Sequence, residues 1–300
     1  MVTRGHGNRF IVYADNEYIP CQLRGKIKHK TFQSTPVAVG DNVIISLVED
    51  GEGVIEEVLP RKSVLSRPVI GRETHEHVLA ANVDSLIIVT SIKQPLLKTG
   101  LIDRFLIAAH IGDLYPVIVI NKIDFGLEPH IKEIIETYRE LGFELFLTTA
   151  IEKKIKPENE TNLLGEYLNN HKSILAGHSG VGKSSLLNLL MPDLNLPTSS
   201  VSKVTNRGRH TTNRMELIHL PGGGFVIDSP GIKVLGLWQA EKDNIFEYYP
   251  EMRHYQDDCR FTPCTHTHEP DCAIKKAVES GKITKFRYRN YLQIYDSLDT

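Results

Sequence analysis

The sequence lacks several features that would assign it to a special class of protein. No stretch reaches the roughly 18 unbroken apolar residues that a membrane-spanning helix needs, so we expect no membrane span. The first ten residues contain no apolar core of the signal-peptide kind, which favours a cytoplasmic location. The chain has only four cysteines. In a reducing compartment so few cysteines are more typical of a metal site or free thiols than of disulfides.

A strong net charge is also absent. The formal net charge of −2 is not typical of a chain that binds nucleic acid over its whole surface. Three segments are nevertheless basic and almost free of acidic residues. Their basic side chains are Arg24, Lys26, Lys28, Lys30, Lys203, Arg207, Arg209, Arg214, Lys282, Lys285, Arg287 and Arg289. One such segment is usually a solvated surface, but three in a nearly neutral chain make a polyanionic partner an equally good explanation.

The pattern of apolar segments predicts three regions. Residues 8–66 contain short β segments separated by Gly, Asp, Asn and Pro turn signals. This spacing fits a small barrel of the oligonucleotide-binding (OB) type, although other small β folds share it. From about residue 80 strands alternate with helices, which predicts parallel strands with helices packed on the sheet. After about residue 236 the chain is polar and aromatic and ends in two expected helices. We therefore expect an α/β protein with domains at 1–68, 69–235 and 236–300.

The segment "GHSGVGKSS" matches the phosphate-loop pattern G-x-x-x-x-G-K-[ST] between an expected strand and an expected helix. Backbone amides and the positive end of that helix stabilise bound phosphate. We expect Lys183 to reach the β- and γ-phosphates and the Ser184 hydroxyl to bind Mg²⁺. The expected nucleotide contacts in this loop are Gly177, His178, Ser179, Gly180, Val181, Gly182, Lys183, Ser184 and Ser185. For Ser185, plain helix packing is the simpler explanation.

The segment "NKID" follows the strand expected at 115–121, at the carboxyl edge where open α/β sheets bind ligands. The Asp124 carboxylate can accept hydrogen bonds from guanine N1–H and the 2-amino group, and adenine offers neither donor. The Asn121 amide can form hydrogen bonds on the O6 and N7 side of the base, and the Lys122 stem can cover the ring face. The alternative is that Asn121 and Asp124 only cap the next helix. The chemistry favours a guanine nucleotide over an adenine nucleotide.

The segment "DSPG" supplies a third part of a nucleotide site. Asp228, at a strand end, is placed to hold Mg²⁺ through water, and the Gly231 amide is placed to meet the γ-phosphate. The segment before this strand, "SKVTNRGRHTTNR", has no hydrophobic period and is interpreted as a mobile loop. Thr211 or Thr212 in it could bind Mg²⁺ only while the γ-phosphate is present, which is how a GTPase switch works.

The order of these segments differs from that of a Ras-like GTPase, in which the phosphate loop comes first. Joining the usual first and last elements and opening the chain elsewhere leaves the sheet intact, because domain termini often lie close together. The sequence therefore predicts a circularly permuted P-loop GTPase. Ile232 stands where Ras-like enzymes carry the glutamine that orients water. His210 is the nearest replacement by type, with an RNA contact as its alternative role.

The C-terminal region contains the spacing C-x4-C-x-H-x5-C, formed by Cys259, Cys264, His266 and Cys272. Three thiolates and one imidazole suit a single tetrahedral Zn²⁺, and four protein ligands make such a site structural. His268 is an alternative for the histidine position, and unliganded thiols are the alternative to a metal. Cys21, inside an expected strand, is interpreted as a buried small apolar residue.

Together these features resemble the ribosome small-subunit-dependent GTPase A family. The matching segments are "ANVDSLIIV", "DRFL", "NKID", "GHSGVGKSSLLN", "RGRHTT", "DSPG" and "CRFTPCTHTHEPDCAI". The resemblance implies a cytoplasmic GTPase of late small-subunit maturation that is stimulated by the subunit and binds its rRNA. It also favours His266 over His268. The second guanine-contacting segment of the family usually contains Ser-Ala followed by glycines, and "TTAIEKKI" here implies a contact through the Ala150 backbone.

The expected ligands are thus GTP or GDP with Mg²⁺, one structural Zn²⁺ and the small ribosomal subunit, and we expect the chain to be monomeric. Two alternatives stay open from the sequence. One is an RNA-binding module in which the nucleotide is only structural. The other is an ATP-using P-loop enzyme, which Asp124 disfavours.

Overall fold

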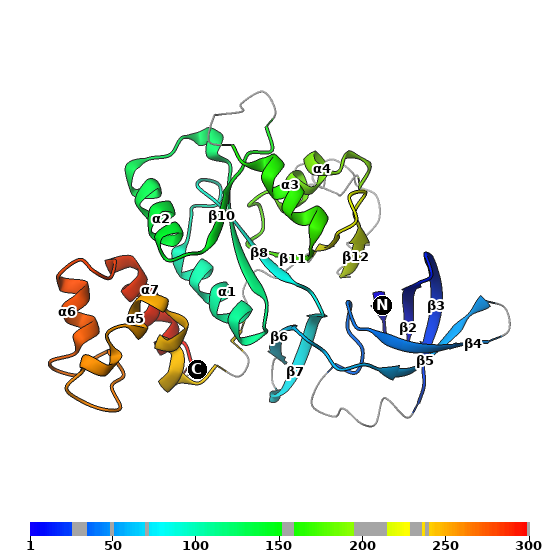
Figure 1. Cartoon of the computed structure of the whole chain (residues 1–300), viewed down its shortest axis with the longest axis horizontal. Coiled ribbons are helices and arrows are strands. Elements are labelled where there is room, and N and C mark those ends of the chain that lie inside the picture. The colour runs from blue at the N-terminus through cyan, green and yellow to red at the C-terminus, as the bar shows by residue number, and fades with distance from the viewer. Residues whose placement is uncertain are drawn as a thin grey trace.

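Figure 1 shows three parts: a barrel, a central sheet covered by helices, and a group of C-terminal helices. The structure is a computed structural model, and it describes residues 1–25, 35–48, 51–69, 72–151, 159–194, 215–228, 236–237 and 240–298, without the side chains of residues 72–74, 193 and 228. The barrel and the C-terminal helices lie at opposite ends of the molecule, with the central sheet between them (Figure 1).

The N-terminal strands have the connectivity expected of an OB-type barrel. They are β1 (Val2–His6), β2 (Arg9–Ala14), β3 (Glu17–Leu23), β4 (Val43–Leu47) and β5 (Gly53–Val58). Neighbouring strands pair in the order β1-β2-β3-β5-β4, with β3 parallel to β5 and the other pairs antiparallel. The Val2 amide donates to the Asp41 carbonyl, 2.8 Å, and the Gly40 amide donates to the Val2 carbonyl, 2.8 Å. The chain before β4 therefore returns to β1. Cys21 is 2% exposed in the barrel core, as predicted.

The central sheet has a permuted strand order. Its strands are β8 (Ser85–Ser91), β9 (Tyr115–Asn121), β10 (Glu144–Leu147), β11 (Lys172–Ala176), β12 (Glu216–His219) and β13 (Phe225–Asp228). The spatial order is β10-β9-β8-β11-β13-β12, and only β12 runs antiparallel to its neighbour β13. β11, which precedes the phosphate loop, is thus central in space but comes after β8, β9 and β10 in the chain. This arrangement confirms the predicted circular permutation.

Helices cover both faces of this sheet because its strands are apolar on both faces. Helices α1 and α2 lie on one side of the sheet and α3 and α4 on the other (Figure 1). Alternate residues of β8 face opposite sides: Leu86 and Ile88 belong to the cluster with α1 and α2, and Ile87 and Val89 to the cluster with α3 and α4. The helices are α1 (Thr99–Ile111), α2 (Pro129–Glu140), α3 (Thr161–Asn170) and α4 (Lys183–Leu190). The alternation of strands and helices predicted from about residue 80, and the helix predicted after the phosphate loop, are confirmed.

The barrel is joined to the central sheet by hydrogen-bonded strands. β1 pairs with β12 in the register Arg4 to Glu216, and these two side chains also form an ion pair. Within the described residues, the strands of the two parts thus form one sheet of 11 strands. A two-stranded ribbon of β6 (Val64–Val69) and β7 (Arg72–Ala81) connects the two parts in the chain. β1, β6 and β7 were not predicted, and the ribbon spans the boundary expected at residue 68.

The C-terminal region packs on the face of the sheet that carries α1. Its helices are α5 (Pro250–Arg253), α6 (Ala273–Glu279) and α7 (Lys285–Asp296), with 3-10 turns at η6 (Lys242–Tyr248) and η7 (Gln256–Asp258). Buried side chains of this region belong to the same hydrophobic cluster as those of α1 and α2; they include Tyr249, Met252, Ile274, Tyr291 and Ile294. The C-terminal region therefore shares its core with the central domain.

One sequence-based expectation about charge is wrong. Arg287, grouped with the basic side chains of the last segment, is 1% exposed and forms ion pairs with Asp103 and Glu251. It is consequently not accessible to a polyanion. Lys285 and Arg289 on the same helix are exposed. Residues 26–30 and 203–214, which hold the other basic segments except Arg24, lie outside the described residues. Within the described part of the chain, no helix is long and apolar enough to cross a membrane.

Candidate functional site

The predicted nucleotide-binding segments meet at one edge of the sheet. β8, β9, β10, β11 and β13 are parallel, so their carboxyl ends lie at the same edge. "NKID" begins at the end of β9, "TTA" follows β10, the phosphate loop follows β11, and "DSPG" begins at the end of β13. This is the edge at which open α/β sheets bind ligands.

The shape of the phosphate loop depends on three glycines. Gly177, Gly180 and Gly182 have φ angles of +143°, +85° and +101°, a range that favours glycine. A Cβ atom on Gly182 would lie 2.4 Å from Asn121 Nδ2, and one on Gly177 would lie 2.1 Å from the Val89 carbonyl oxygen. Any larger residue at these two positions would displace the loop from the sheet.

The lysine of the loop is held within it. Lys183 Nζ donates to the Gly177 carbonyl, 2.7 Å, and to the His178 carbonyl, 3.4 Å. α4 begins at Lys183, so Ser184 and Ser185 lie in its first turn, where backbone N–H groups carry partial positive charge. An ammonium group, backbone amides and a hydroxyl are thus gathered at one helix start, a combination that suits phosphate and its Mg²⁺.

The "NKID" segment contacts the phosphate loop directly. Asn121 is 1% exposed, and its Nδ2 donates to the Val181 carbonyl, 2.8 Å. Lys122 Nζ donates to the Gly180 carbonyl, 2.7 Å. Burial lowers the pKa of Lys122, and the charge of Asp124 opposes that shift. Two segments that are 60 residues apart in the chain are therefore bound into one structure.

Two threonines after β10 orient this segment, and the sequence analysis did not assign them a role. Thr148 Oγ1 donates to Asn121 Oδ1, 3.2 Å, and Thr149 Oγ1 donates to Asp124 Oδ1, 3.0 Å. Both threonines are buried, whereas Ala150 next to them is half-buried. The signal in the sequence was their position: hydroxyl residues directly after a strand that neighbours the strand of "NKID".

Some predicted site residues lie wholly or partly outside the residues that the structure describes. The backbone of Asp228 ends β13 and pairs with Leu175 of β11, which brings it to the start of the phosphate loop, but its side chain is not described. Gly231, His210, Thr211 and Thr212 lie wholly outside the described residues.

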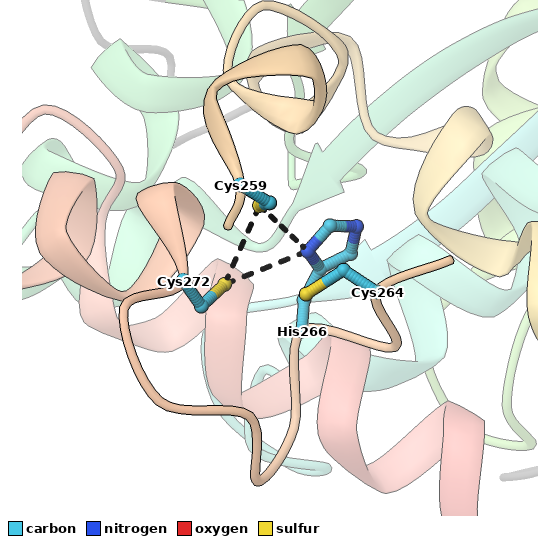
Figure 2. A group of neighbouring side chains, drawn as sticks. All are labelled: Cys259, Cys264, His266 and Cys272. Carbon is cyan, nitrogen blue, oxygen red and sulfur yellow. Dashed lines mark hydrogen bonds between the residues drawn. The ribbon is translucent and has the colours of Figure 1, made fainter. Parts of the chain in front are cut away.

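The predicted metal ligands form one cluster, shown in Figure 2. The ligand atoms of Cys259, Cys264, His266 and Cys272 all lie within 4.8 Å of one another. Cys259 Sγ lies 3.9 Å from Cys272 Sγ and 3.6 Å from His266 Nδ1, and Cys272 Sγ lies 3.5 Å from the same nitrogen (Figure 2). His268 is exposed and is not in the cluster.

These distances fit a tetrahedral metal. Ligand atoms that lie about 2.0 to 2.3 Å from one Zn²⁺ are separated by about 3.5 to 3.8 Å along the edges of the tetrahedron. The separations among Cys259, Cys272 and His266 are close to these edges, and the Cys264 sulfur lies within 4.8 Å of the other three ligand atoms. The four side chains can therefore surround one Zn²⁺, and four protein ligands would leave no position for a substrate.

The backbone of the cluster is fixed from two sides. Tyr288 and Tyr291 of α7 donate their hydroxyl hydrogens to the carbonyls of His266, 2.8 Å, and Thr265, 2.5 Å. Glu269 accepts from the Thr265 amide, 2.7 Å. Burial alone would raise the pKa of Glu269, but hydrogen bonds from Thr265 and neighbouring amides lower it to about 2. The segment with the metal ligands is therefore attached to α7 by two tyrosine hydroxyls. It is also held internally by the Glu269 carboxylate.

A phosphate loop after a central strand, an "NKID" segment bonded to it and a permuted strand order define a circularly permuted GTPase. The sequence profile of the RsgA GTPase family matches residues 58–238, and that of the RsgA N-terminal domain matches residues 1–55. The chain belongs to the RsgA GTPase family.

Known relatives are similar over nearly their whole length. The small ribosomal subunit biogenesis GTPase RsgA of Bacteroides fragilis is 35% identical, over 99% of this chain and 96% of the relative. The protein of the same name from Chlorobaculum parvum is 39% identical, over 100% of this chain and 97% of the relative. The crystal structure of YjeQ from Thermotoga maritima matches with a TM-score of 0.76 at 35% identity, covering 99% of this chain and 96% of that one. A crystal structure of YloQ, described as a circularly permuted GTPase, has a TM-score of 0.70 at 29% identity and covers 99% and 93%.

Proposed function

We propose that this protein hydrolyses GTP to GDP and phosphate during late maturation of the small ribosomal subunit, and that the subunit stimulates the reaction. The observation that carries the GTPase part is the direct contact of the "NKID" segment with the phosphate loop, through Asn121 to Val181 and Lys122 to Gly180. A base and its phosphates can then be bound at one site. The names of the curated relatives support the small subunit as the partner.

The base is read by Asp124 in this proposal. Its carboxylate accepts from guanine N1–H and the 2-amino group, and the hydroxyl of Thr149 keeps it oriented. The Lys122 stem covers one face of the ring. The Asn121 amide group lies on the O6 and N7 side and also holds the phosphate loop, and the backbone of Ala150 supplies a further contact to the base.

The phosphates are bound by the loop from Gly177 to Ser185, with Lys183 directed to the β- and γ-phosphates. Membership of a GTPase family implies Mg²⁺ together with GTP. Ser184 would bind this ion directly and Asp228 through water. Thr211 or Thr212 would bind it only in the GTP state, in which the Gly231 amide meets the γ-phosphate. When bound, Mg²⁺ would supply positive charge that neutralises the phosphate oxygens.

Ile232 stands where Ras-like enzymes carry the glutamine that orients water, and its side chain has no hydrogen-bonding group. His210 is therefore our candidate for orienting the attacking water. Single-turnover hydrolysis by His210→Ala, saturated with small subunits, tests this role. We expect a rate at least about tenfold lower than that of the wild type. A rate equal to that of the wild type would exclude His210 from the chemistry.

The C-terminal region is proposed to hold one structural Zn²⁺ and to contact rRNA. The exposed Lys282, Lys285 and Arg289 follow the metal cluster in the chain and support a polyanionic partner on this side of the molecule. A role in the biogenesis of ribosomal subunits also supports a cytoplasmic location.

A base-exchange experiment tests the nucleotide assignment. Xanthine carries an oxygen where guanine carries the 2-amino group, so Asp124→Asn replaces an acceptor with a donor that matches xanthine. We expect the wild type to bind GTP in preference to ATP and XTP, and Asp124→Asn to lose roughly ten- to hundredfold in GTP affinity while gaining affinity for XTP. If Asp124→Asn binds GTP as the wild type does, Asp124 does not read the base.

A further inference from the structure

Helix α7 is attached to α1 through a buried asparagine. Asn290 is 4% exposed, and its Nδ2 donates to Asp103 Oδ2, 2.7 Å. Its Oδ1 accepts from Thr99 Oγ1, 3.3 Å. A Cβ atom on Gly100 would lie 3.4 Å from the same oxygen, so the two helices are in contact here. One side chain of the C-terminal region thus binds two positions in the first turns of α1.

The partner of Asn290 is held from several directions. Asp103 is 1% exposed, accepts from the Tyr138 hydroxyl, 2.6 Å, and pairs with Arg287. Arg287 Nε in turn donates to Glu251 Oε1, 2.6 Å. In a buried network each polar group depends on its protein partners, since water cannot replace them. The first turns of α1 therefore have a fixed position relative to α7.

The turn before α1 lies against the phosphate loop. This turn, between β8 and α1, comprises residues 92–95 and is called the 92–95 turn below. Ser91 Oγ donates to the Pro95 carbonyl, 2.8 Å, and the Ile92 amide donates to the Asn121 carbonyl, 3.3 Å. A Cβ atom on Gly180 would lie 3.7 Å from Pro95 Cδ. Thr99, the first residue of α1, follows Pro95 by only four residues.

This turn also supplies a binding partner for the lysine of "NKID". Lys122 Nζ donates to the carbonyls of Gln94 and Gly180, the second at 2.7 Å. Lys122 therefore bridges the 92–95 turn and the phosphate loop, with its stem on the side proposed to receive the base. A shift of the start of α1 would move the Gln94 carbonyl and loosen the hold on Lys122.

We propose that Thr99 and Asn290 are positioning residues for the guanine nucleotide site, so that the C-terminal helix α7 sets the affinity for nucleotide without touching it. The inference rests on the proposed GTP site. It identifies a connection from the metal-binding region to that site through described residues.

The same interface offers a matched control that separates a positioning role of Thr99 and Asn290 from a purely structural role. Arg104 Nη2 donates to Ser297 Oγ, 2.5 Å, near the C-terminal end of α7. Ser297→Ala removes a hydrogen bond between the same two regions. Arg104 is on α1 but contacts Ser297 beyond the far end of α7 and not Asn290. Loss of the hydrogen bond between Arg104 and Ser297 should weaken the interface while leaving Thr99 in place.

The test compares GDP binding and stability for full-length, metal-loaded variants. Thr99→Val keeps the shape of the side chain but removes the hydroxyl, Thr99→Ser keeps the hydroxyl, and Asn290→Ala removes both bonds. We expect Thr99→Val to raise the Kd for a fluorescent GDP analogue roughly fivefold, the loss expected for one hydrogen bond, chiefly through faster dissociation. Thr99→Ser should bind like the wild type, and Ser297→Ala should lose stability toward urea without a change in Kd.

Two results would overturn the inference. One is GDP binding by Thr99→Val that equals the wild type. The other is an equal rise in Kd for Ser297→Ala, which would reduce the effect to general weakening of the interface. Thr99→Val keeps the comparison possible if Asn290→Ala does not fold. If the wild type itself binds neither GDP nor GTP, the proposed function fails, and that result appears before any variant is compared.

Discussion

Two threonine hydroxyl groups donate hydrogen bonds to the side chains that are proposed to bind guanine. Thr148 bonds to Asn121 and Thr149 bonds to Asp124, both from a buried position after β10. A carboxylate that is held in one orientation loses less conformational freedom when it binds a base than one that must be ordered first. At the scale of single residues, we therefore expect nucleotide affinity to depend on groups that do not touch the nucleotide.

Replacing Thr149 by valine should show this dependence. The variant keeps the volume and branching of the side chain but removes the hydrogen bond to Asp124. We expect an affinity for GDP about fivefold lower, corresponding to about 1 kcal/mol, by isothermal titration calorimetry. Thr149→Ser should retain most of the affinity because it retains the hydroxyl. Equal affinity of Thr149→Val and the wild type would mean that Asp124 needs no support.

The two histidines of the metal-binding segment give a second residue-scale prediction. His266 is buried within the cluster and His268 is exposed outside it. We expect the wild type and His268→Ala to contain one Zn²⁺ per chain by elemental analysis. His266→Ala should bind Zn²⁺ more than about 100-fold less tightly and have a lower Tm, because metal binding contributes directly to folding. Loss of zinc from His268→Ala, but not from His266→Ala, would contradict the assignment.

At the scale of elements, α7 is bound to the rest of the molecule by buried charge. Arg287 pairs with Asp103 of α1 and Glu251 of α5, and its guanidinium lies 4.4 Å from the centre of the Tyr249 ring. Removing one member of a buried ionic group leaves the others uncompensated, which is far more costly than the loss of a surface ion pair. The attachment of α7 is therefore specific to these partners.

The variant Arg287→Met tests this attachment. Methionine keeps an unbranched stem of similar shape but leaves Asp103 and Glu251 without a cation. We expect the free energy of unfolding to fall by about 3 to 5 kcal/mol in urea titrations. Arg289→Ala, on the exposed face of the same helix, should change it by less than about 0.5 kcal/mol. Similar effects of the two substitutions would show that the buried charges do not hold α7.

The elements could largely be predicted from the sequence, but their long-range contacts could not. Apolar periodicity and local motifs determine strands such as β8 and β9, and the four metal ligands lie within fourteen residues. The burial of Arg287 depends on Asp103, 184 residues earlier in the chain. A local charge pattern shows only a basic helix and contains no information about that partner. The basic segment was misread in part for this reason.

At the scale of the whole molecule, one sheet runs from the nucleotide site into the barrel. β13, which ends at Asp228, pairs with β12, and β12 pairs with β1 of the barrel. The pairing of Arg4 with Glu216 across 212 residues was not foreseeable from either segment, since neither shows an unusual strand pattern. On the other side, α7 packs on α1, and the segment with the metal ligands is hydrogen-bonded to α7. Both end regions are thus attached to the domain that is proposed to bind GTP.

This arrangement suits a protein whose nucleotide state controls contact with a large partner. The barrel and the C-terminal region lie on opposite sides of the nucleotide domain (Figure 1). A partner that contacts both regions could change the geometry of the site between them, which is how binding energy from a remote surface alters a reaction rate.

The most direct test of this account is the turnover of GTP with and without purified small ribosomal subunits, at one stated salt concentration because phosphate contacts weaken as salt rises. The account predicts slow turnover by the protein alone and an increase of about tenfold or more with saturating small subunits, equivalent to at least about 1.4 kcal/mol of added transition-state stabilisation. Equal turnover in the two conditions would contradict it and would favour a binding protein in which the nucleotide is only structural.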